Sequence, residues 1–264
     1  MKHFVAIAFF LAHALCAAQT RLKIDNQGVA LDGYFYAGNS LKAPTIVALH
    51  GCSGMLNTRG GVNARTTDYA KLLPAQGWHV LFLDSFTARG VKSVCGGNNQ
   101  VTQAQRVTDV QAAVAYLAKR EDVDASRIGI LGWSHGGSTT LFANDKNVQY
   151  ATPLRAAVAF YPGCTDVRGQ PIFWQPARPV LMQLGSVDDW TNPIPCQRLV
   201  SLWPEWVRQD TYANAQHGFD SDGPVRPIHL TTSRGGKTVH AGGEPAAKAA
   251  SQAKLIAFFK EHFN

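Results

Sequence analysis

The sequence predicts an α/β fold in which a mostly parallel sheet is covered by helices on both faces. Short apolar segments rich in β-branched residues alternate with longer segments of helical periodicity, as in βαβ units. Ile46–Leu49 and Val80–Leu83 are entirely apolar, as strands buried on both sides should be. With 264 residues, 45% hydrophobic and 16% charged, the chain can bury one large core without a metal or a dense disulfide framework.

The expected elements follow one another in a regular order. An antiparallel hairpin of Leu22–Ile24 and Gly28–Tyr36 edges the sheet. The other strands are expected at Thr45–Leu49, His79–Leu83, Ile128–Leu131, Ala156–Phe160, Val180–Leu184 and Val207–Tyr212. Helices are expected at Thr66–Gln76, Ala104–Lys119, His135–Ala143, around Cys196–Trp203, and at Pro245–His262. Because no internal repeat or long linker interrupts this order, one domain is expected.

The positive charge of the chain does not predict a nucleic-acid partner. Lysine and arginine outnumber the acidic residues, 25 to 18, and give a net charge of +7. These cations are scattered along the chain, whereas binding to nucleic acid needs several on one surface. We therefore expect no nucleic-acid partner and attribute the charge to solubility.

Residues 1–18 have the pattern of a secretory signal peptide. A basic N-terminus precedes the apolar segment Phe4–Leu15, which is followed by small residues. That segment is shorter than the about 20 residues that a membrane-spanning helix needs. Cleavage before Gln19 is favoured; the alternatives are a cut two residues earlier and, less favoured because leucine precedes it, lipid attachment to Cys16. The mature domain, 19–264, is expected to be secreted or periplasmic, with no stable membrane insertion.

Export changes how the cysteines are interpreted. Removal of the signal leaves four of the five: Cys52, Cys95, Cys164 and Cys196. An even number in an oxidising compartment predicts two disulfides rather than free thiols. Four cysteines allow three pairings, and their spacing alone does not choose among them.

The segment Gly132-Trp133-Ser134-His135-Gly136 satisfies the G-x-S-x-G pattern of a nucleophile elbow. It directly follows a predicted buried strand and directly precedes a predicted helix, which is the context that this motif requires. Glycines are needed on both sides because the serine lies on a sharp, strained turn, where larger side chains would collide with neighbouring elements. Ser134 is therefore predicted to be a nucleophile presented at the tip of the strand.

A serine nucleophile needs a histidine to take its proton and a carboxylate to orient that histidine. The predicted strand Val180–Leu184 leads to Asp188 and Asp189, of which only one can face the histidine, and Asp188 is favoured. The predicted strand Val207–Tyr212 leads to His217. The order serine, acid, histidine is the one that α/β-hydrolases use.

The remaining histidines are interpreted as structural or solvent-exposed, namely His79, His229, His240 and His262. His135 would direct its side chain away from the nucleophile and contribute its backbone N–H. No cluster of histidine, cysteine and aspartate has the spacing of zinc ligands, so no metal site is expected.

Acyl transfer also needs two N–H donors for the developing oxyanion. The segment His50-Gly51-Cys52 follows the strand Thr45–Leu49, at the position from which an α/β-hydrolase draws one donor. The residue after the nucleophile supplies the other. We therefore expect an oxyanion hole formed by the backbone N–H groups of Cys52 and His135.

These segments resemble the motifs of the dienelactone hydrolase family of α/β-hydrolases. The resemblance runs from about Ala43 to the C-terminus and rests on Leu83–Gly90, Arg127–Gly137, Asp188–Thr191 and His217–Asp220. It implies a single-domain esterase or lactonase that needs no cofactor, with nucleophile, acid and base at Ser134, Asp188 and His217. Dienelactone hydrolase itself has a cysteine nucleophile where this chain has serine. Arg89 matches a family position that binds the substrate carboxylate.

The strand order implied by this resemblance also selects a disulfide pairing. In that order, Cys52 and Cys95 follow neighbouring strands at their carboxyl ends, and Cys164 and Cys196 do so two strands further on. We therefore predict the disulfides Cys52–Cys95 and Cys164–Cys196, both bracing loops around the site.

The predicted function is that of an exported serine hydrolase that cleaves small-molecule carboxylic esters or lactones through an acyl-enzyme. Trp190 and Trp133 are candidates for an apolar substrate pocket, whereas Trp174 and Phe86 fit the core better. Two alternatives are a peptidase of the same fold, which usually carries a further large domain, and a non-catalytic binding module. The complete set of serine, aspartate and histidine disfavours the binding module.

Overall fold

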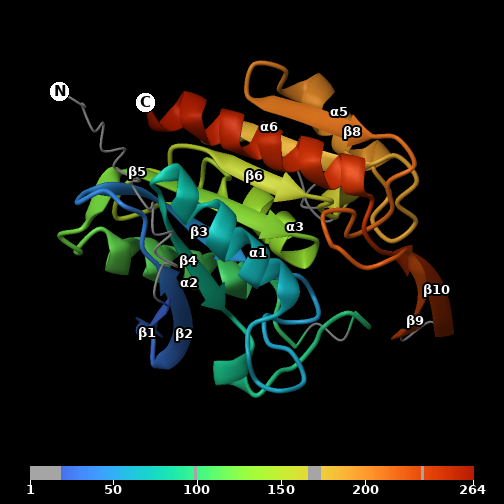
Figure 1. The fold of residues 1–264 in the computed structure, drawn as a ribbon, viewed down its shortest axis with the longest axis horizontal. Helices are drawn as coiled ribbons and strands as arrows, with labels where there is room; N and C mark the ends of the chain where they lie inside the picture. The colour runs from blue at the N-terminus through green and yellow to red at the C-terminus, as the bar shows by residue number, and fades with distance from the viewer. Residues whose placement is uncertain (1–18, 98–99, 166–173, 233–234) are drawn as a thin grey trace, which may run out of the picture.

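The structure is a computed structural model that describes residues 19–97, 100–165, 174–232 and 235–264. A mostly parallel sheet forms the centre of the molecule. Its eight strands lie in the order β1-β2-β4-β3-β5-β6-β7-β8 (Figure 1). β1 (Gln19–Asn26) and β2 (Val29–Tyr36) form the predicted antiparallel hairpin, and β2 pairs antiparallel with β4. All other neighbours are parallel. The predicted signal peptide, 1–18, lies outside the described residues.

The parallel strands are present where the sequence predicts them. Their bounds are β3 Ala43–Leu49, β4 His79–Asp84, β5 Val123–Trp133, β6 Ala157–Phe160, β7 Val180–Gly185 and β8 Val207–Tyr212. All side chains of β3 and β4 are buried, which explains their continuous apolar sequence. Because these strands are parallel, the loops after β3, β5, β7 and β8 meet at one edge of the sheet, where ligands bind in such folds.

Helices cover both faces of the sheet, which confirms that prediction. α1 (Ala64–Leu72) and α6 (Pro245–Phe263) pack on one face and lie in front of the sheet in Figure 1. The other face is covered by α2 (Gln103–Leu117), α3 (His135–Ala143) and α5 (Ile194–Leu202). Each face has its own hydrophobic cluster, so the core consists of two layers separated by the sheet.

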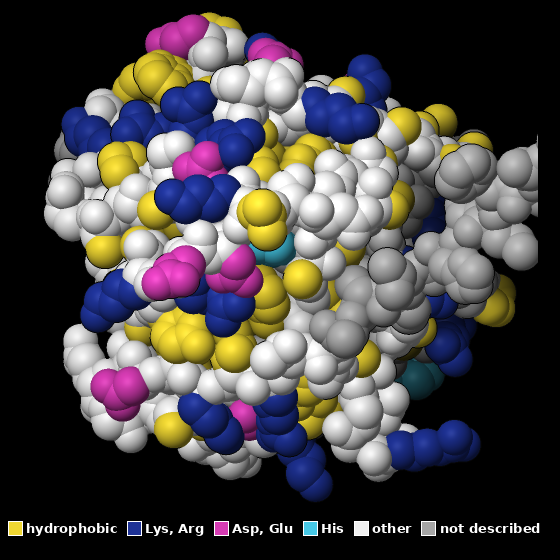
Figure 2. Space-filling view, turned by 60° about the vertical axis from the view of Figure 1, so that its left-hand side comes forward, with side chains coloured by type: hydrophobic (Ala, Val, Ile, Leu, Met, Phe, Trp, Pro, Cys, Tyr) yellow, Lys and Arg dark blue, Asp and Glu magenta, His cyan; other side chains and the backbone are white. Residues whose placement is uncertain are grey.

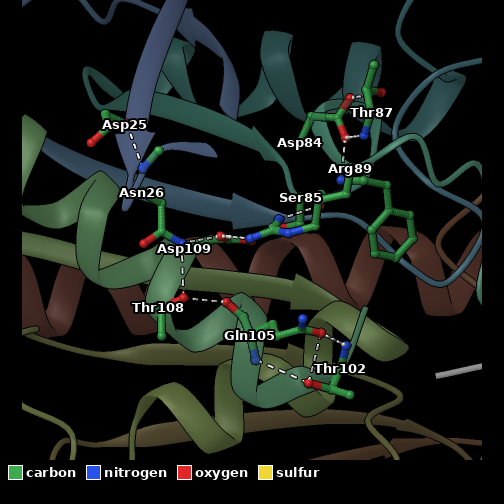
Figure 3. Close-up of polar contacts among 12 residues, drawn as sticks. Asp25, Asn26, Asp84, Ser85, Thr87, Arg89, Thr102, Gln105, Thr108 and Asp109 are labelled. Atoms are coloured by element: carbon green, nitrogen blue, oxygen red, sulfur yellow. Dashed lines mark hydrogen bonds and ion pairs between the residues drawn. The ribbon is translucent and has the colours of Figure 1, made fainter. Parts of the chain in front are cut away.

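Two helix ends have identifiable physical causes. α1 stops at Leu72, earlier than predicted, and Pro74–Gln76 form a short 3₁₀ turn instead. The cause is Pro74, which has no N–H to donate to the preceding turn of an α-helix. α2 begins with a capping box, in which the Thr102 hydroxyl accepts from the Gln105 N–H and the Gln105 side chain accepts from the Thr102 N–H (Figure 3).

A second sheet of two strands was not predicted. It is a hairpin of β9 (Arg226–Thr232) and β10 (Gly235–Ala241) that stands apart from the main sheet (Figure 1). Only one residue of β10, Val239, is buried, so no buried face enforces the alternation by which strands are recognised in a sequence. The hairpin joins the main body where Ala241 pairs with His217 and the Gly242 N–H donates to the His217 carbonyl at 2.9 Å.

The surface gives no sign of a basic band on the face drawn in Figure 2. Lysine and arginine side chains are spread there in separate groups among acidic and apolar ones. Within the residues that the structure describes, no helix is long and apolar enough to cross a membrane.

Candidate active site

Ser134 lies on a strained turn between β5 and α3, as the motif predicts. Its φ and ψ are 55° and −118°, in a region that residues with a side chain rarely occupy. The flanking glycines allow this turn because a Cβ on Gly132 would lie 2.1 Å from the Gly136 carbonyl oxygen, and one on Gly136 would lie 2.1 Å from the Leu49 oxygen. The turn therefore needs glycine at both positions.

The structure brings Ser134, His217 and Asp188 into one chain of hydrogen bonds. The Ser134 Oγ lies 2.9 Å from His217 Nε2, and His217 Nδ1 lies 2.8 Å from Asp188 Oδ2. The three residues follow β5, β8 and β7 and are all buried. With the Nδ1–H donated to the carboxylate, Nε2 is free to accept the serine proton, which is the tautomer that nucleophilic catalysis requires.

The loop after β7 fixes the Asp188 carboxylate. Its Oδ1 accepts from the backbone N–H groups of Trp190 and Thr191, at 2.9 and 2.8 Å. Its Oδ2 lies 2.9 Å from the Thr191 hydroxyl, which is also 3.1 Å from His217 Nδ1. The sequence offered no sign of this role for Thr191 beyond its place in the Asp188–Thr191 motif.

Asp189 takes a different direction from Asp188. It is exposed and receives hydrogen bonds from the His240 backbone N–H and ring Nδ1 of β10, both at 2.8 Å. The Lys237 ammonium donates to the Asp189 carbonyl at 2.9 Å. Asp188 therefore faces His217 while Asp189 anchors the hairpin.

Two aromatic rings pack against the His217 imidazole. The ring centroids of Tyr161 and Trp190 lie 4.5 and 4.7 Å from that of the histidine. Trp190 was predicted from the sequence as a pocket residue, whereas Tyr161, which follows β6 and has a φ of 35°, was not. The position of Tyr161 directly after a buried strand on the same edge as Ser134 is the signal that could have identified it.

Tyr161 is held by a buried acid, Asp220. Its hydroxyl donates to Asp220 at 2.7 Å, the Tyr69 hydroxyl donates to the same carboxylate at 3.0 Å, and the Arg65 guanidinium lies 3.2 Å away. Burial holds the pKa of Tyr69 and of Tyr161 well above the ordinary value for tyrosine, so both hydroxyls remain donors.

The two predicted oxyanion donors make no hydrogen bond to another group within the described part of the protein. Within the described residues, the backbone N–H groups of Cys52 and His135 donate to no protein acceptor. The loop that carries Cys52 runs beside the serine, since a Cβ on Gly51 would lie 3.7 Å from the Ser134 Cβ. Both N–H groups are therefore available to an oxygen atom bound near Ser134.

Both predicted disulfides are present, Cys52–Cys95 and Cys164–Cys196. The second is buried, whereas the first is partly accessible and borders the space around Ser134. The Val94 N–H also donates to the Cys52 carbonyl at 2.9 Å, so the loops after β3 and β4 are joined twice.

Two hollows meet at Ser134, and Trp190 borders both. The smaller has a volume of about 200 Å³ and is lined on the His135 side by Cys52, Val94, Cys95, Val101, Gln103, Ser138 and Gly163, among others. The larger, of about 430 Å³, lies on the His217 side and extends to the hairpin, with Arg65, Tyr161, Arg226, Ile228 and Ala241 in its walls.

Arg89, which the resemblance assigns to the substrate carboxylate, has its guanidinium engaged by groups of the protein itself. Its guanidinium binds the buried Asp109 with two hydrogen bonds of 2.7 and 3.0 Å and donates to the Ser85 carbonyl at 2.6 Å (Figure 3). Asn26 of β1 donates to the same carboxylate at 2.7 Å. Arg89 lines neither hollow, so it is a structural ion pair between the loop after β4 and helix α2.

Trp133, Trp174 and Phe86 belong to the core. Trp133 and Phe86 are at most 2% exposed, and Trp174 is buried with its indole N–H donating to the Leu141 carbonyl at 2.6 Å. The expectation for Trp174 and Phe86 is thus confirmed, and Trp133 is not a pocket residue. Among the residues that the structure describes, no group of three or more His, Cys, Asp or Glu side chains could hold a metal ion.

Comparison with protein families gives a match over most of the chain. The family model described as "Dienelactone hydrolase family" matches residues 31–263. None of the curated proteins matches the chain.

Several solved structures share the fold at low sequence identity. One is a dienelactone hydrolase-like promiscuous phosphotriesterase from metagenomic libraries, with 20% identity, a TM-score of 0.72 and coverage of 94% of this chain and 100% of that one. An esterase of Pyrococcus furiosus has 16% identity, a TM-score of 0.63 and coverage of 98% and 97%. An acylaminoacyl peptidase of Pyrococcus horikoshii has 15% identity and a TM-score of 0.68, over 94% of this chain but 42% of the peptidase. The fold is that of the α/β-hydrolases.

Proposed function

The chain belongs to the dienelactone hydrolase family, and from this premise we propose that it is a serine hydrolase that cleaves carboxylic esters or lactones through an acyl-enzyme. The observation that carries the proposal is the hydrogen-bonded chain of Ser134, His217 and Asp188, with links of 2.9 and 2.8 Å. A hydrolase fold alone would not specify the nucleophile, but a buried serine bonded to a carboxylate-oriented imidazole is the arrangement that activates a hydroxyl.

In the proposed reaction, the Ser134 Oγ attacks the ester carbonyl while its proton passes to His217 Nε2. Asp188 stabilises the imidazolium that forms. The negative charge on the carbonyl oxygen is received by the N–H groups of Cys52 and His135. His217 then gives its proton to the departing alcohol, and water, activated by the same histidine, releases the acid from Ser134.

The two hollows suggest how an ester would lie. The leaving oxygen must face His217 Nε2, so the alcohol part belongs in the larger hollow of about 430 Å³. The acyl part then belongs in the smaller one of about 200 Å³, beside His135 and the Cys52–Cys95 disulfide, with Trp190 contacting both parts. We therefore propose small-molecule substrates with short acyl chains and bulkier alcohols.

The proposed location is outside the cytoplasm, with residues 1–18 as a cleaved signal peptide and 19–264 as the mature domain. The two disulfides support this proposal, because such bonds persist in oxidising compartments.

The test is hydrolysis of p-nitrophenyl esters from acetate to octanoate by the mature protein and by Ser134→Ala, together with fluorophosphonate labelling of both. We expect turnover and labelling of the wild type only, with kcat/KM highest for acetate to butyrate and at least about tenfold lower for octanoate, since the longer chain exceeds the small hollow. A folded wild type that neither turns over nor labels would refute the proposal in favour of a binding module. Faster cleavage of acylated peptides than of esters would favour a peptidase.

A further inference from the structure

Arg106 of helix α2 is a large, charged side chain with no contact to solvent, 0% exposed, and the chemistry proposed above does not use it. We propose that Arg106 is a positioning residue that holds the two halves of the oxyanion hole together and directs a positive charge toward them. This inference rests on the proposed function, because it concerns the same N–H groups.

The guanidinium reaches both segments that carry the oxyanion donors. One nitrogen, Nη2, donates to the His50 carbonyl at 2.9 Å, two residues before Cys52. The other, Nη1, donates to the His135 Nδ1 at 2.8 Å, on the residue whose own N–H is the second donor. The planar fork of arginine presents its donors in a fixed geometry that holds two acceptors in place, whereas the lysine ammonium is a point charge with rotatable donors. Arg106 therefore fixes the loop after β3 relative to the start of α3.

These two segments also touch each other directly. A Cβ on Gly136 would lie 2.1 Å from the Leu49 oxygen and 2.6 Å from the His50 oxygen. A small shift of either segment would therefore change the spacing of the two N–H groups. Donors act in catalysis only when they are held in place before the charge develops.

Among the described residues, the Arg106 guanidinium has no acid in direct contact, although the buried Asp109 and Asp84 act on its charge. Within the described part of the chain, no carboxylate forms an ion pair with it, since the nearby Asp109 is bound by Arg89. Its Nε has no hydrogen-bond partner, and its Cζ lies 5.3 Å from the centre of the Phe86 ring. Burial lowers the pKa of Arg106 to about 10 although Asp109 and Asp84 raise it, so the side chain is still cationic at neutral pH.

The two neighbouring imidazoles are neutral and do not share this charge. Burial and then Arg106 lower the pKa of His135 to about 3, and the same two causes hold the pKa of His50 well below its ordinary value. His50 donates its Nδ1–H to the Gly51 carbonyl at 2.8 Å and accepts from the Ser85 N–H at 3.3 Å. Of these three side chains, only Arg106 carries a charge.

A buried cation without an acid partner destabilises a fold, so its presence behind an oxyanion hole needs a compensating benefit. That benefit arises when the substrate carbonyl oxygen becomes negative, because the cation and the two N–H groups it holds then act on a full charge. A neutral ester carbonyl gains much less. Loss of Arg106 should therefore lower kcat and leave KM nearly unchanged.

The experiment compares Arg106→Met and Arg106→Lys with the wild type, using kcat and KM for p-nitrophenyl acetate and inhibition by phenylboronic acid, which forms a tetrahedral adduct on an active serine. We expect Arg106→Met to lower kcat by roughly 30- to 300-fold, somewhat less than the effect of deleting one oxyanion donor, with KM within about threefold. Inhibition by phenylboronic acid should weaken by at least about tenfold. Arg106→Lys keeps the charge but loses the rigid fork that fixes the two acceptors relative to each other, so kcat should stay about five- to twentyfold below wild type.

The matched control is Arg178→Met. Arg178 also donates to a backbone carbonyl, that of Leu154 at 2.8 Å, but at the amino ends of the strands, opposite the site. The substitution Arg178→Met should leave kcat and the inhibition by phenylboronic acid unchanged. A folded Arg106→Met with kcat within threefold of wild type overturns the inference, as does an unchanged response to phenylboronic acid. If Arg106→Met does not fold, the inference is overturned by an Arg106→Lys variant whose kcat equals that of the wild type. A wild type without turnover refutes the proposed function instead.

Discussion

Asp188 and Asp189 are neighbours in the chain and form nearly identical pairs in opposite surroundings. Each places a carboxylate oxygen 2.8 Å from a histidine Nδ1. In the pair Asp188–His217, the side chains are 1% and 6% exposed, whereas in Asp189–His240 they are 42% and 45% exposed. Geometry alone does not distinguish the two pairs, so their roles must come from burial and from what lies beyond each histidine.

The difference teaches what a carboxylate needs in order to act in chemistry. Beyond His217 lies the Ser134 hydroxyl, at 2.9 Å, and both residues are buried. His240 lies on the strand β10, and the other side of its ring faces solvent. Electrostatic interactions are strong in the first environment and screened in the second. The buried pair should therefore control activity, and the exposed pair should affect only the attachment of the hairpin.

The largest effect is expected from Asp188→Asn. An amide NH₂ facing His217 Nδ1 favours the wrong imidazole tautomer, so kcat for p-nitrophenyl acetate should fall by roughly 10³ to 10⁴, as is typical of this change in a serine triad. Asp189→Asn is the matched variant one residue away and should change kcat by less than about threefold. If Asp189→Asn proved the more damaging of the two, the assignment of the acid would have to be reversed.

A second effect concerns stability and extends the comparison to Asp220. This carboxylate is 1% exposed and binds Tyr69, Tyr161 and Arg65. Asp220→Asn leaves Arg65 without its acid, and breaking such a buried pair should lower the free energy of unfolding by about 3 kcal/mol, measured by urea denaturation.

The control for this measurement is Asp222→Asn. Asp222 also pairs with a cation, Lys248, but its side chain is 72% exposed. Its replacement should leave the urea midpoint nearly unchanged, because exposed ion pairs contribute little to stability. Equal destabilisation by the two changes would mean that burial is not what separates these acids.

The same contrast explains what could be predicted from the sequence. Ser134, Asp188 and His217 follow strands whose apolar sequences are enforced by burial, so the strands were predicted from the sequence, and the structure brings the three residues after them into hydrogen-bonding distance. The nucleophile elbow was identified because its glycines are required by contacts as short as 2.1 Å. The disulfide pairing followed from the strand order of the family.

Features that depend on long-range partners were missed. The hairpin β9–β10 has few buried side chains, so its sequence carries little alternation. Arg106 lies on a helix as an ordinary charged residue, and only the folded chain brings it to His50 and His135, 56 and 29 residues away. Arg89 was assigned to the substrate by resemblance, but its position is decided by Asp109, 20 residues away.

The smallest effect is expected at the exposed pair itself and depends on pH. Hydrogen bonds from the His240 ring and N–H lower the pKa of Asp189, although its slight burial acts in the opposite direction. A carboxyl group whose pKa is lower in the folded state stabilises that state above its ordinary pKa of about 3.9, and this contribution is lost as the pH falls through the lower, folded value. Protection of the β9–β10 amides from hydrogen exchange should therefore be insensitive to this group near neutrality and should decrease below about pH 4.

Asp189→Asn imitates the protonated carboxyl and supplies the reference for that measurement. At neutral pH the variant should show slightly weaker amide protection in β9–β10 than the wild type, because the remaining hydrogen bond from the His240 N–H lacks a charged acceptor. The difference should shrink below pH 4, as the wild-type carboxyl takes up its proton and becomes equivalent to the amide. A difference in amide protection that persists unchanged to pH 3 would show that the charge of Asp189 does not hold the hairpin. The attachment would then depend on the hydrogen bond from Lys237 to the Asp189 carbonyl, which the variant retains.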